Sequence, residues 1–214
     1  MPANIYKTAD GKRVPGVTTV IGGNLGWNKQ QLLYWANQQG LDGKNHREVS
    51  DKAADVGTVA HLMVEKELKG EKFDWPVLGQ DMGLDKEQIK QAESAFGAFV
   101  EWRDLVNFEL LYSEHTIVHE ELSYGGQIDV AAIQNKVSII DLKTSKDVYP
   151  DHKIQISAYG QLYNYKHPEA PVEAYYILRI GKDGSFAYHY YPELENEWEA
   201  FKCLLKLNEL KKII

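Results

Sequence analysis

Two segments in the middle of the chain decide its fold: Gly125-Gly126-Gln127-Ile128-Asp129-Val130 and Ile139-Ile140-Asp141-Leu142-Lys143-Thr144-Ser145. Both are predicted to be buried strands, because aliphatic and β-branched residues dominate them. Each nevertheless carries a carboxylate, Asp129 or Asp141, and the second also carries Lys143. Charged side chains are rarely buried unless something pairs them. The two segments therefore combine a structural core with a candidate functional site.

The polar residues Gln134-Asn135-Lys136 predict a short turn between strands at 126–133 and 137–143. With the turn centred on Asn135, the numbers of paired residues sum to about 270, so Asp129 lies opposite Asp141. Opposed residues have Cβ atoms about 5 Å apart, and two carboxylates at that distance repel each other unless a cation lies between them. Lys143 follows Asp141 by two positions and therefore projects from the same face of the strand.

Two interpretations of this hairpin stay open on its residues alone. Two carboxylates beside an ammonium suit a hard divalent ion such as Mg²⁺ or Mn²⁺, which needs few protein ligands and keeps several waters. Such an ion binds a scissile phosphate and acidifies a water, which a lysine can orient while it stabilises charge on the phosphorane. In the other interpretation, Lys143 neutralises an aspartate across the hairpin and the cluster is structural.

Length and composition limit the classes of protein to which the chain can belong. The chain has 214 residues with 43% hydrophobic content, which suits one compact domain. No stretch approaches the roughly 18 apolar residues of a membrane span, and the N-terminal residues lack a signal or transit pattern. We therefore expect a cytoplasmic protein that does not associate with membranes. A net charge of −7 argues against a basic surface that coats duplex DNA, but metal-binding carboxylates keep a nuclease possible.

One cysteine, Cys203, is present, which excludes a cysteine-ligated iron–sulfur cluster within one chain. Its position beside Leu204 and Leu205 predicts a packing role in a helix.

Periodicity around the hairpin predicts an α/β (α+β) domain of layered helices and strands. The β-branched run Val17–Ile21 suggests a strand, and the glycines at 22–26 suggest a turn after it. Residues 40–50 and 71–84 are expected to be loops, with Ser50 as the N-cap of the helix that follows. Helices are expected at 28–39, 51–68, 85–106, 150–166 and 193–212, and strands at 108–120, 126–133, 137–143, 172–180 and 185–191.

Two helical pairs flank the hairpin. His61 and Glu65 are four residues apart and share a helical face, as do Gln155 and Tyr159. Taken alone, the first pair suits a surface hydrogen bond, and the second suits either contact with a phosphate or base or ordinary helix–sheet packing. Gly57 costs its helix about 1 kcal/mol relative to alanine, which suggests that another group approaches it closely.

Read together, these motifs resemble the PD-(D/E)XK nuclease superfamily, and within it the RecB-type exonuclease branch, which includes phage exonucleases and the mitochondrial genome maintenance exonuclease. The resemblance spans roughly residues 14 to 165, with five motifs in the family's order. They are Gly57-Thr58-Val59-Ala60-His61-Leu62-Met63-Val64-Glu65, then Glu114, Gly125-Gly126-Gln127-Ile128-Asp129, Asp141-Leu142-Lys143-Thr144-Ser145 and Gln155-Ile156-Ser157-Ala158-Tyr159. The segments Val14-Pro15-Gly16-Val17-Thr18-Thr19-Val20 and Leu33-Tyr34-Trp35-Ala36 also resemble phage members.

The resemblance implies a restriction-endonuclease-like core, with a mixed central sheet flanked by helices and an N-terminal helical extension. It divides the single domain into an extension (1–50), a core (51–191) and a C-terminal helix (192–214). The implied activity is hydrolysis of DNA by an exonuclease that uses Mg²⁺ or Mn²⁺. The chain departs from those family members that carry a four-cysteine iron–sulfur cluster, because it lacks the cysteines, so we expect no such cluster and a small stand-alone exonuclease. The implied substrate is single-stranded DNA or DNA ends, in phage or cellular recombination, repair or replication.

The resemblance also implies residue roles. His61, Asp129, Asp141 and the Leu142 carbonyl would bind metal with support from Glu114, Lys143 would be catalytic, and Gln155, Tyr159 and Thr144 would contact DNA. The N-terminal helices would form a wall or arch that admits a strand, where Trp27 and Trp35 could stack on bases or belong to the core. Two other functions stay open: a structure-selective endonuclease of the same fold, and a non-catalytic DNA-binding recombination module.

Overall fold

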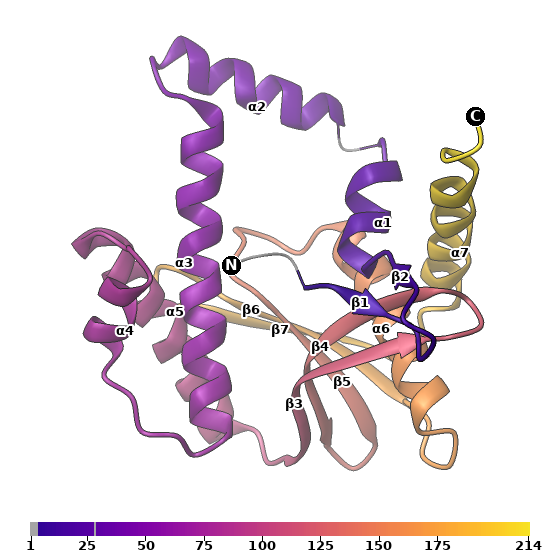
Figure 1. The fold of residues 1–214 in the computed structure, drawn as a ribbon. Coiled ribbons are helices and arrows are strands. Elements are labelled where there is room, and N and C mark those ends of the chain that lie inside the picture. Colours follow the sequence, from indigo (N-terminus) through magenta and orange to yellow (C-terminus); the bar gives the residue numbers. More distant parts are fainter. Residues whose placement is uncertain (1–3, 28) are drawn as a thin grey trace.

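The computed structural model describes residues 4–27 and 29–214 (Figure 1). The helices are α1 (Val17–Asn24), α2 (Lys29–Leu41), α3 (His46–Leu68), α4 (Trp75–Asp81), α5 (Lys86–Leu105), α6 (Pro150–Lys166) and α7 (Glu195–Leu210). The strands are β1 (Tyr6–Lys7), β2 (Arg13–Val14), β3 (Glu109–His119), β4 (Tyr124–Ile133), β5 (Val137–Lys143), β6 (Ala174–Ile180) and β7 (Phe186–Tyr191).

A five-stranded sheet in the order β3-β4-β5-β6-β7 forms the centre of the molecule. Strand β5 pairs in parallel with β6, and the other neighbours are antiparallel. Two parallel neighbours need a crossover connection, which α6 provides. The predicted fold class, a mixed sheet flanked by helices, is confirmed.

Helices bury both faces of this sheet. Consecutive side chains of a strand point to opposite faces: Ile139 and Ile177 join the core beneath α1, α6 and α7, whereas Ile140 and Leu178 join the core beneath α3 and α5. Figure 1 shows α3 on one side of the sheet and α1, α6 and α7 on the other. Because both faces are covered, the central strand reads as a continuous apolar run rather than as an alternating one.

The strand predicted over Val17–Ile21 is wrong, because these residues form helix α1, which continues through Gly22 and Gly23. Its buried residues are Val17, Val20 and Ile21, which lie on one face of a helix by their spacing of three and four. Packing of this face against α6 and α7 outweighs the modest strand preference of β-branched residues.

Two predicted loops contain helical residues. Helix α3 begins at His46 rather than after Ser50, because the Asn45 side chain caps it by accepting a hydrogen bond from Arg47 N. Helix α4 lies within the loop predicted at 71–84, where the Asp74 side chain accepts from Val77 N and a proline occupies the first turn. The predicted start of the second helix, Asn28, lies outside the described residues.

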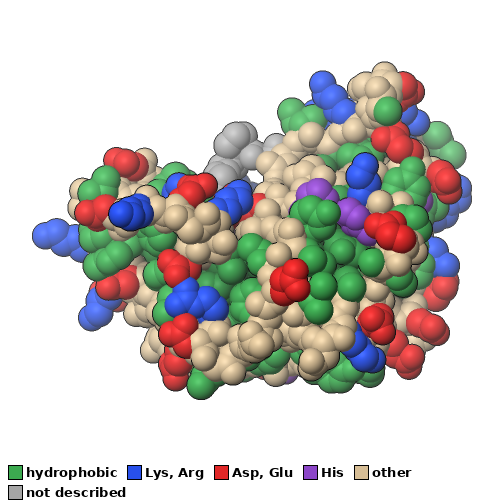
Figure 2. All heavy atoms as spheres, turned by 90° about the horizontal axis from the view of Figure 1, so that it is seen from below, with side chains coloured by type: hydrophobic (Ala, Val, Ile, Leu, Met, Phe, Trp, Pro, Cys, Tyr) green, Lys and Arg blue, Asp and Glu red, His purple; other side chains and the backbone are tan. Residues whose placement is uncertain are grey.

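Two further features concern the surface. Cys203 is exposed, so its predicted packing role is wrong. On the face shown in Figure 2, Lys and Arg side chains are interspersed with Asp and Glu, and the described residues there form no extended basic patch. Within 4–27 and 29–214, every helix is too short or too polar to cross a lipid bilayer.

Candidate metal centre

Strands β4 and β5 part at the position of the two aspartates. Their pairing follows the predicted register, and the last pair towards the site is Val130 with Ile140. At the next position, Asp129 Oδ2 accepts a hydrogen bond of 2.7 Å from the amide of Leu142. The Asp129 side chain thus binds backbone of β5 at the point where the regular pairing ends, and this contact holds its carboxylate beside the end of β5.

His61, Glu114 and Asp129 come together from α3, β3 and β4. One ligand atom of each lies within 4.8 Å of the others, and His61 Nδ1 is 3.8 Å from Asp129 Oδ1. Glu114 reaches this position because its neighbours in β3 pair with Val130 and Ile128 on either side of Asp129. The surface pair considered for His61 is not formed, since Glu65 instead pairs with Lys69.

Glu114 is held in an unusual conformation. Its φ is +51°, a left-handed backbone that costs a residue other than glycine of order 1–3 kcal/mol and is concentrated at functional sites. Gln127 Nε2 donates a hydrogen bond of 2.6 Å to Glu114 Oε2, and the Asn4 amide donates in turn to Gln127 Oε1. This chain of amides fixes the direction of the Glu114 carboxyl group.

Asp141 lies deeper, with 1% of its surface exposed. The Lys143 ammonium is 2.5 Å from Asp141 Oδ2, but no described residue donates a hydrogen bond of good geometry to either carboxylate oxygen. Buried oxygens are normally satisfied by donors or by a cation. The Lys143 charge therefore provides only part of the compensation that this carboxylate requires.

Burial shifts the pKa of four side chains at this site, His61, Glu114, Asp129 and Asp141. Burial and, after it, the nearby Asp129 charge raise the pKa of Glu114 to about 8. Burial lowers the pKa of His61 to about 4. Burial also raises the pKa of Asp129 and of Asp141, and in both cases the positive charge of Lys143 works in the opposite direction. At neutral pH His61 is an uncharged imidazole, the form in which histidine binds metals.

These residues fit a divalent ion. The donor set is one neutral imidazole and three carboxylates, and carboxylate oxygens are the ligands that Mg²⁺ and Mn²⁺ prefer. The unsatisfied oxygens of Asp141 and the crowding of Glu114 and Asp129 are independent signs that the cluster has too little positive charge. His61, Glu114 and Asp129 thus form a group that could hold a metal ion, with Asp141 beside Lys143 at its deeper end.

Glycines allow helices to approach this site closely. A Cβ on Gly57 of α3 would meet Thr144 Oγ1 at 2.8 Å, and one on Gly126 would meet the Tyr159 ring at 2.7 Å. The predicted close approach at Gly57 is therefore to Thr144, the residue after Lys143.

The remaining predicted pair lies on α6. Gln155 Nε2 donates a hydrogen bond of 2.9 Å to the Tyr159 hydroxyl. The Tyr159 ring is buried at 5% exposure, which leaves the partly buried Gln155 as the more accessible member of the pair.

His152 is a candidate functional residue that the sequence motifs did not reveal. It lies three residues before Gln155 and seven before Tyr159, on the same face of α6. Its Nδ1 accepts a hydrogen bond of 3.2 Å from Tyr149 N, so Nε2 carries the proton in the neutral ring. Burial and the Lys143 charge lower the pKa of His152, whereas the Asp141 charge raises it. The spacing from the Gln155 motif was the available signal.

The two tryptophans considered either for stacking or for the core are both outside the core. Trp27 is 63% exposed and Trp35 is 36% exposed, so the core interpretation is wrong for each.

Comparison with known proteins adds little to these observations. No family model matches the sequence, and no curated protein matches it. A crystal structure from Eubacterium rectale described as a "putative exonuclease" shares 16% identity over 75% of this chain, with a TM-score of 0.46. The alignment spans 65% of the length of that protein. The crystal structure of SSO0001 shares 17% identity over 71% of each chain, with a TM-score of 0.34.

Proposed function

We propose that this chain is a Mg²⁺- or Mn²⁺-dependent deoxyribonuclease that removes nucleotides from single-stranded DNA or DNA ends. The observation that carries the proposal is the meeting of His61, Glu114 and Asp129 next to the Asp141–Lys143 pair. These residues come from four different elements, α3, β3, β4 and β5. A structural ion-pair cluster between two strands would not require a histidine from α3. The proposed setting is DNA recombination, repair or replication in the cytoplasm of a cell or in a phage-infected host.

The side chains divide the chemistry among them. His61, Glu114, Asp129, Asp141 and the Leu142 carbonyl would hold the metal, which when bound supplies a Lewis acid for the scissile phosphate and lowers the pKa of a water. The positive charge of Lys143 favours the ionised form of Asp141, and its ammonium can orient the attacking water or stabilise charge that develops on the phosphorane. The hydrogen bond from Leu142 N aims Asp129 at the same space.

The groups proposed for DNA contact lie beside the metal centre. Gln155 presents an amide whose orientation Tyr159 fixes, and an amide can donate to a phosphate oxygen. Tyr159 therefore contributes by positioning Gln155, since its buried ring offers no face for a base. Thr144 follows Lys143 and adjoins α3 at Gly57, where its hydroxyl is also within reach of a strand.

Nucleotide release from end-labelled single- and double-stranded oligonucleotides in Mg²⁺ or Mn²⁺ tests the proposal. Labels at the 5′ and then the 3′ end give the polarity, and a circular single strand serves as the substrate without ends. We expect mononucleotides or short products from linear DNA and no cleavage of the circle. Cleavage of the circle would identify an endonuclease, and binding without cleavage of any substrate would identify a non-catalytic module and refute the proposal.

His152 provides a sharper prediction on the same site. We expect His152→Asn to lower kcat/KM about 10- to 100-fold, because it removes a hydrogen bond from Nε2 to a charged phosphate. His152→Gln places a donor near the Nε2 position and should restore most of this loss.

A control separates this role from the structural one, in which Nδ1 accepts from Tyr149 N. Asparagine keeps an acceptor near Nδ1, so His152→Asn should retain the parent Tm. Equal kinetic loss in both variants with a lowered Tm would show that His152 only caps α6.

A further inference from the structure

We propose that His115 and His167 form a second metal site, which takes a transition-metal ion such as Zn²⁺ between strand β3 and the C-terminal end of helix α6. This site is called the β3–α6 histidine pair below. His115 belongs to β3, and His167 is the residue that caps the end of α6. Successive side chains of a strand point to opposite faces, so Glu114 joins His61 of α3 whereas His115 faces α6. The pair therefore lies apart from the candidate metal centre, and the proposal does not depend on the proposed function.

The two imidazole rings lie at a separation that suits a shared ion. Their centroids are 6.0 Å apart, with an angle of 41° between the ring planes. Zn²⁺ binds an imidazole nitrogen at about 2.0–2.1 Å, so two rings on one tetrahedral ion have centroids about 5 Å apart. Small rotations of the side chains would close the remaining gap of about 1 Å. Imidazole ligands favour Zn²⁺, Ni²⁺ or Cu²⁺, whereas Mg²⁺ prefers oxygen.

Each ring carries a buried nitrogen that lacks a partner, and this observation carries the proposal. Nε2 of His115 and Nε2 of His167 are both buried, and neither forms a hydrogen bond with a residue in the parts of the chain that the structure describes. Buried polar atoms are normally satisfied by protein groups, by water or by an ion. Because the two nitrogens belong to neighbouring rings, one ion can satisfy both.

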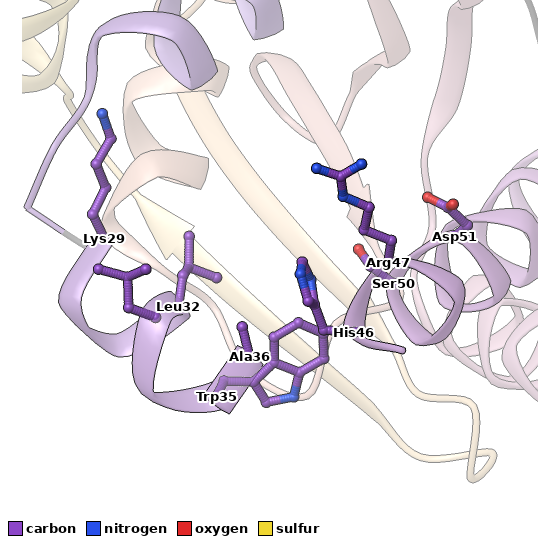
Figure 3. Close-up of a pocket in the computed structure, with 9 residues that line it drawn as sticks. Lys29, Leu32, Trp35, Ala36, His46, Arg47, Ser50 and Asp51 are labelled. Atoms are coloured by element: carbon purple, nitrogen blue, oxygen red, sulfur yellow. The ribbon is translucent and has the colours of Figure 1, made fainter. Parts of the chain in front are cut away.

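Other histidines of the chain have different surroundings. His119 also lies on β3, but its Nδ1 accepts a hydrogen bond of 3.3 Å from Leu122 N. His46 is exposed and lies beside Trp35 in the hollow between α2 and α3 (Figure 3). An indole ring cannot serve as a second ligand for a metal ion. The β3–α6 histidine pair differs from both cases, because each ring has a second imidazole beside it.

The electrostatic surroundings favour a cation at the pair. Glu169 Oε1 is 3.8 Å from His167 Nδ1, and a metal-binding histidine usually donates its other ring N–H to such a carboxylate, which leaves Nε2 free to bind the metal. The C-terminal end of a helix carries about half a negative charge, which also stabilises a cation. The Lys166 charge acts in the opposite direction, but this side chain is exposed and water and salt screen it.

Aromatic packing holds both imidazoles in place. Tyr112 stacks on His115 with centroids 4.4 Å apart and on His167 with centroids 5.2 Å apart. Tyr163 packs against His167 at 4.6 Å. Ligands that are already ordered lose little freedom when an ion binds, which favours affinity. Zn²⁺ normally takes four ligands, and Tyr112 is 37% exposed, so water can reach the edge of the cluster to fill the other positions.

Isothermal titration calorimetry of the full chain with Zn²⁺ at about pH 7.5 tests the site, together with the Tm in Zn²⁺ and in EDTA. The background variant His61→Ala with Asp129→Asn removes an imidazole and a carboxylate from the candidate metal centre, so that binding there does not mask the second site. We expect this background to bind Zn²⁺ and to gain in Tm. His115→Phe and His167→Phe keep an aromatic ring against Tyr112 but remove the nitrogens, and each should abolish both effects.

Two further variants make the outcome decisive. Glu169→Gln should weaken Zn²⁺ binding about tenfold, as expected for loss of a carboxylate that supports a ligand. The Glu169 side chain is 72% exposed, so this variant reports on the site even if a phenylalanine variant folds poorly. His189→Phe is the matched control, because His189 is also half-buried and lies on β7 at the opposite edge of the sheet. It should bind Zn²⁺ like the background.

Unchanged Zn²⁺ binding in both phenylalanine variants would overturn the proposal, because the ion would then bind elsewhere. A background protein that binds no Zn²⁺ would also overturn it, and a buried water would then account for the two nitrogens. Zn²⁺ binding at the pair in a chain that cuts no DNA would refute the proposed function alone.

Discussion

Lys143→Ala is expected to lower kcat for DNA cleavage about 100- to 1,000-fold, the usual cost of removing one charged group that stabilises a transition state. Asp141→Asn is expected to be at least as damaging, because it removes a carboxylate from the deeper end of the metal centre. The Lys143 ammonium lies 2.5 Å from Asp141 Oδ2, so the two side chains form one unit and their effects should not add. Nucleotide release under single-turnover conditions in Mg²⁺ measures both variants.

Stability must be separated from chemistry in this experiment. Removal of Lys143 leaves the Asp141 charge buried without its partner, which can cost about 3–5 kcal/mol. The double variant Lys143→Met with Asp141→Asn removes both charges and should fold at least as stably as the single variants while remaining inactive. Lys206→Ala changes an exposed lysine of α7 and should cleave like the parent. Full activity in both single variants would refute the catalytic assignment.

Asp129→Asn is expected to increase stability without metal and to abolish stabilisation by metal. Asparagine keeps an oxygen that can accept from Leu142 N, but it removes one of the buried charges that repel each other around His61. We expect a gain of about 1–2 kcal/mol in the free energy of unfolding at pH 8.5 in EDTA. Mg²⁺ at 100 times its Kd should stabilise the parent by about 2.7 kcal/mol and this variant very little. Urea unfolding of both proteins measures these differences.

The pH dependence of the same experiment has a definite sign. Glu114 has a raised pKa of about 8 when folded, so the folded chain holds more protons than the unfolded chain between about pH 4.3 and 8. Without metal, stability of the parent should therefore fall as pH rises from 6.5 to 8.5. His61, with its pKa lowered to about 4, contributes little above pH 6.5.

Asp129→Asn should flatten this decline, because the Asp129 charge is one cause of the raised Glu114 pKa. A structural ion-pair cluster predicts the opposite set of results. In that case Asp129→Asn would destabilise the protein, and Mg²⁺ would affect both proteins equally.

Much of the sheet and its covering could be predicted from the sequence, because the relevant signals are local. The turn at Asn135 determines the pairing of β4 with β5, and the observed pairs follow the predicted register. Helix α6 spans 150–166 as predicted, since Pro150 marks a helix start and apolar residues follow it over several turns. The order of chemical motifs along the chain is likewise a property of the sequence alone.

The tertiary structure decided the features that depend on distant partners. Val17–Ile21 has the composition of a strand but forms a helix, because its apolar face packs against α6 and α7. The position of His152 near the charges of Lys143 and Asp141 is likewise a result of the tertiary structure.

The hairpin of β4 and β5 shows what the sequence determines and what the tertiary structure determines. By itself the sequence determined that Asp129, Asp141 and Lys143 lie on two neighbouring strands, with the two aspartates at matching positions, because side chains alternate along a strand and the turn sets the register. Only the tertiary structure decided that His61 and Glu114 join Asp129, and that Asp141 is buried beneath them with its oxygens unsatisfied. His61 is more than 50 positions away from Glu114 and from Asp129 in the sequence. The packing of α3 on the sheet, with Gly57 against Thr144, brings His61 to them.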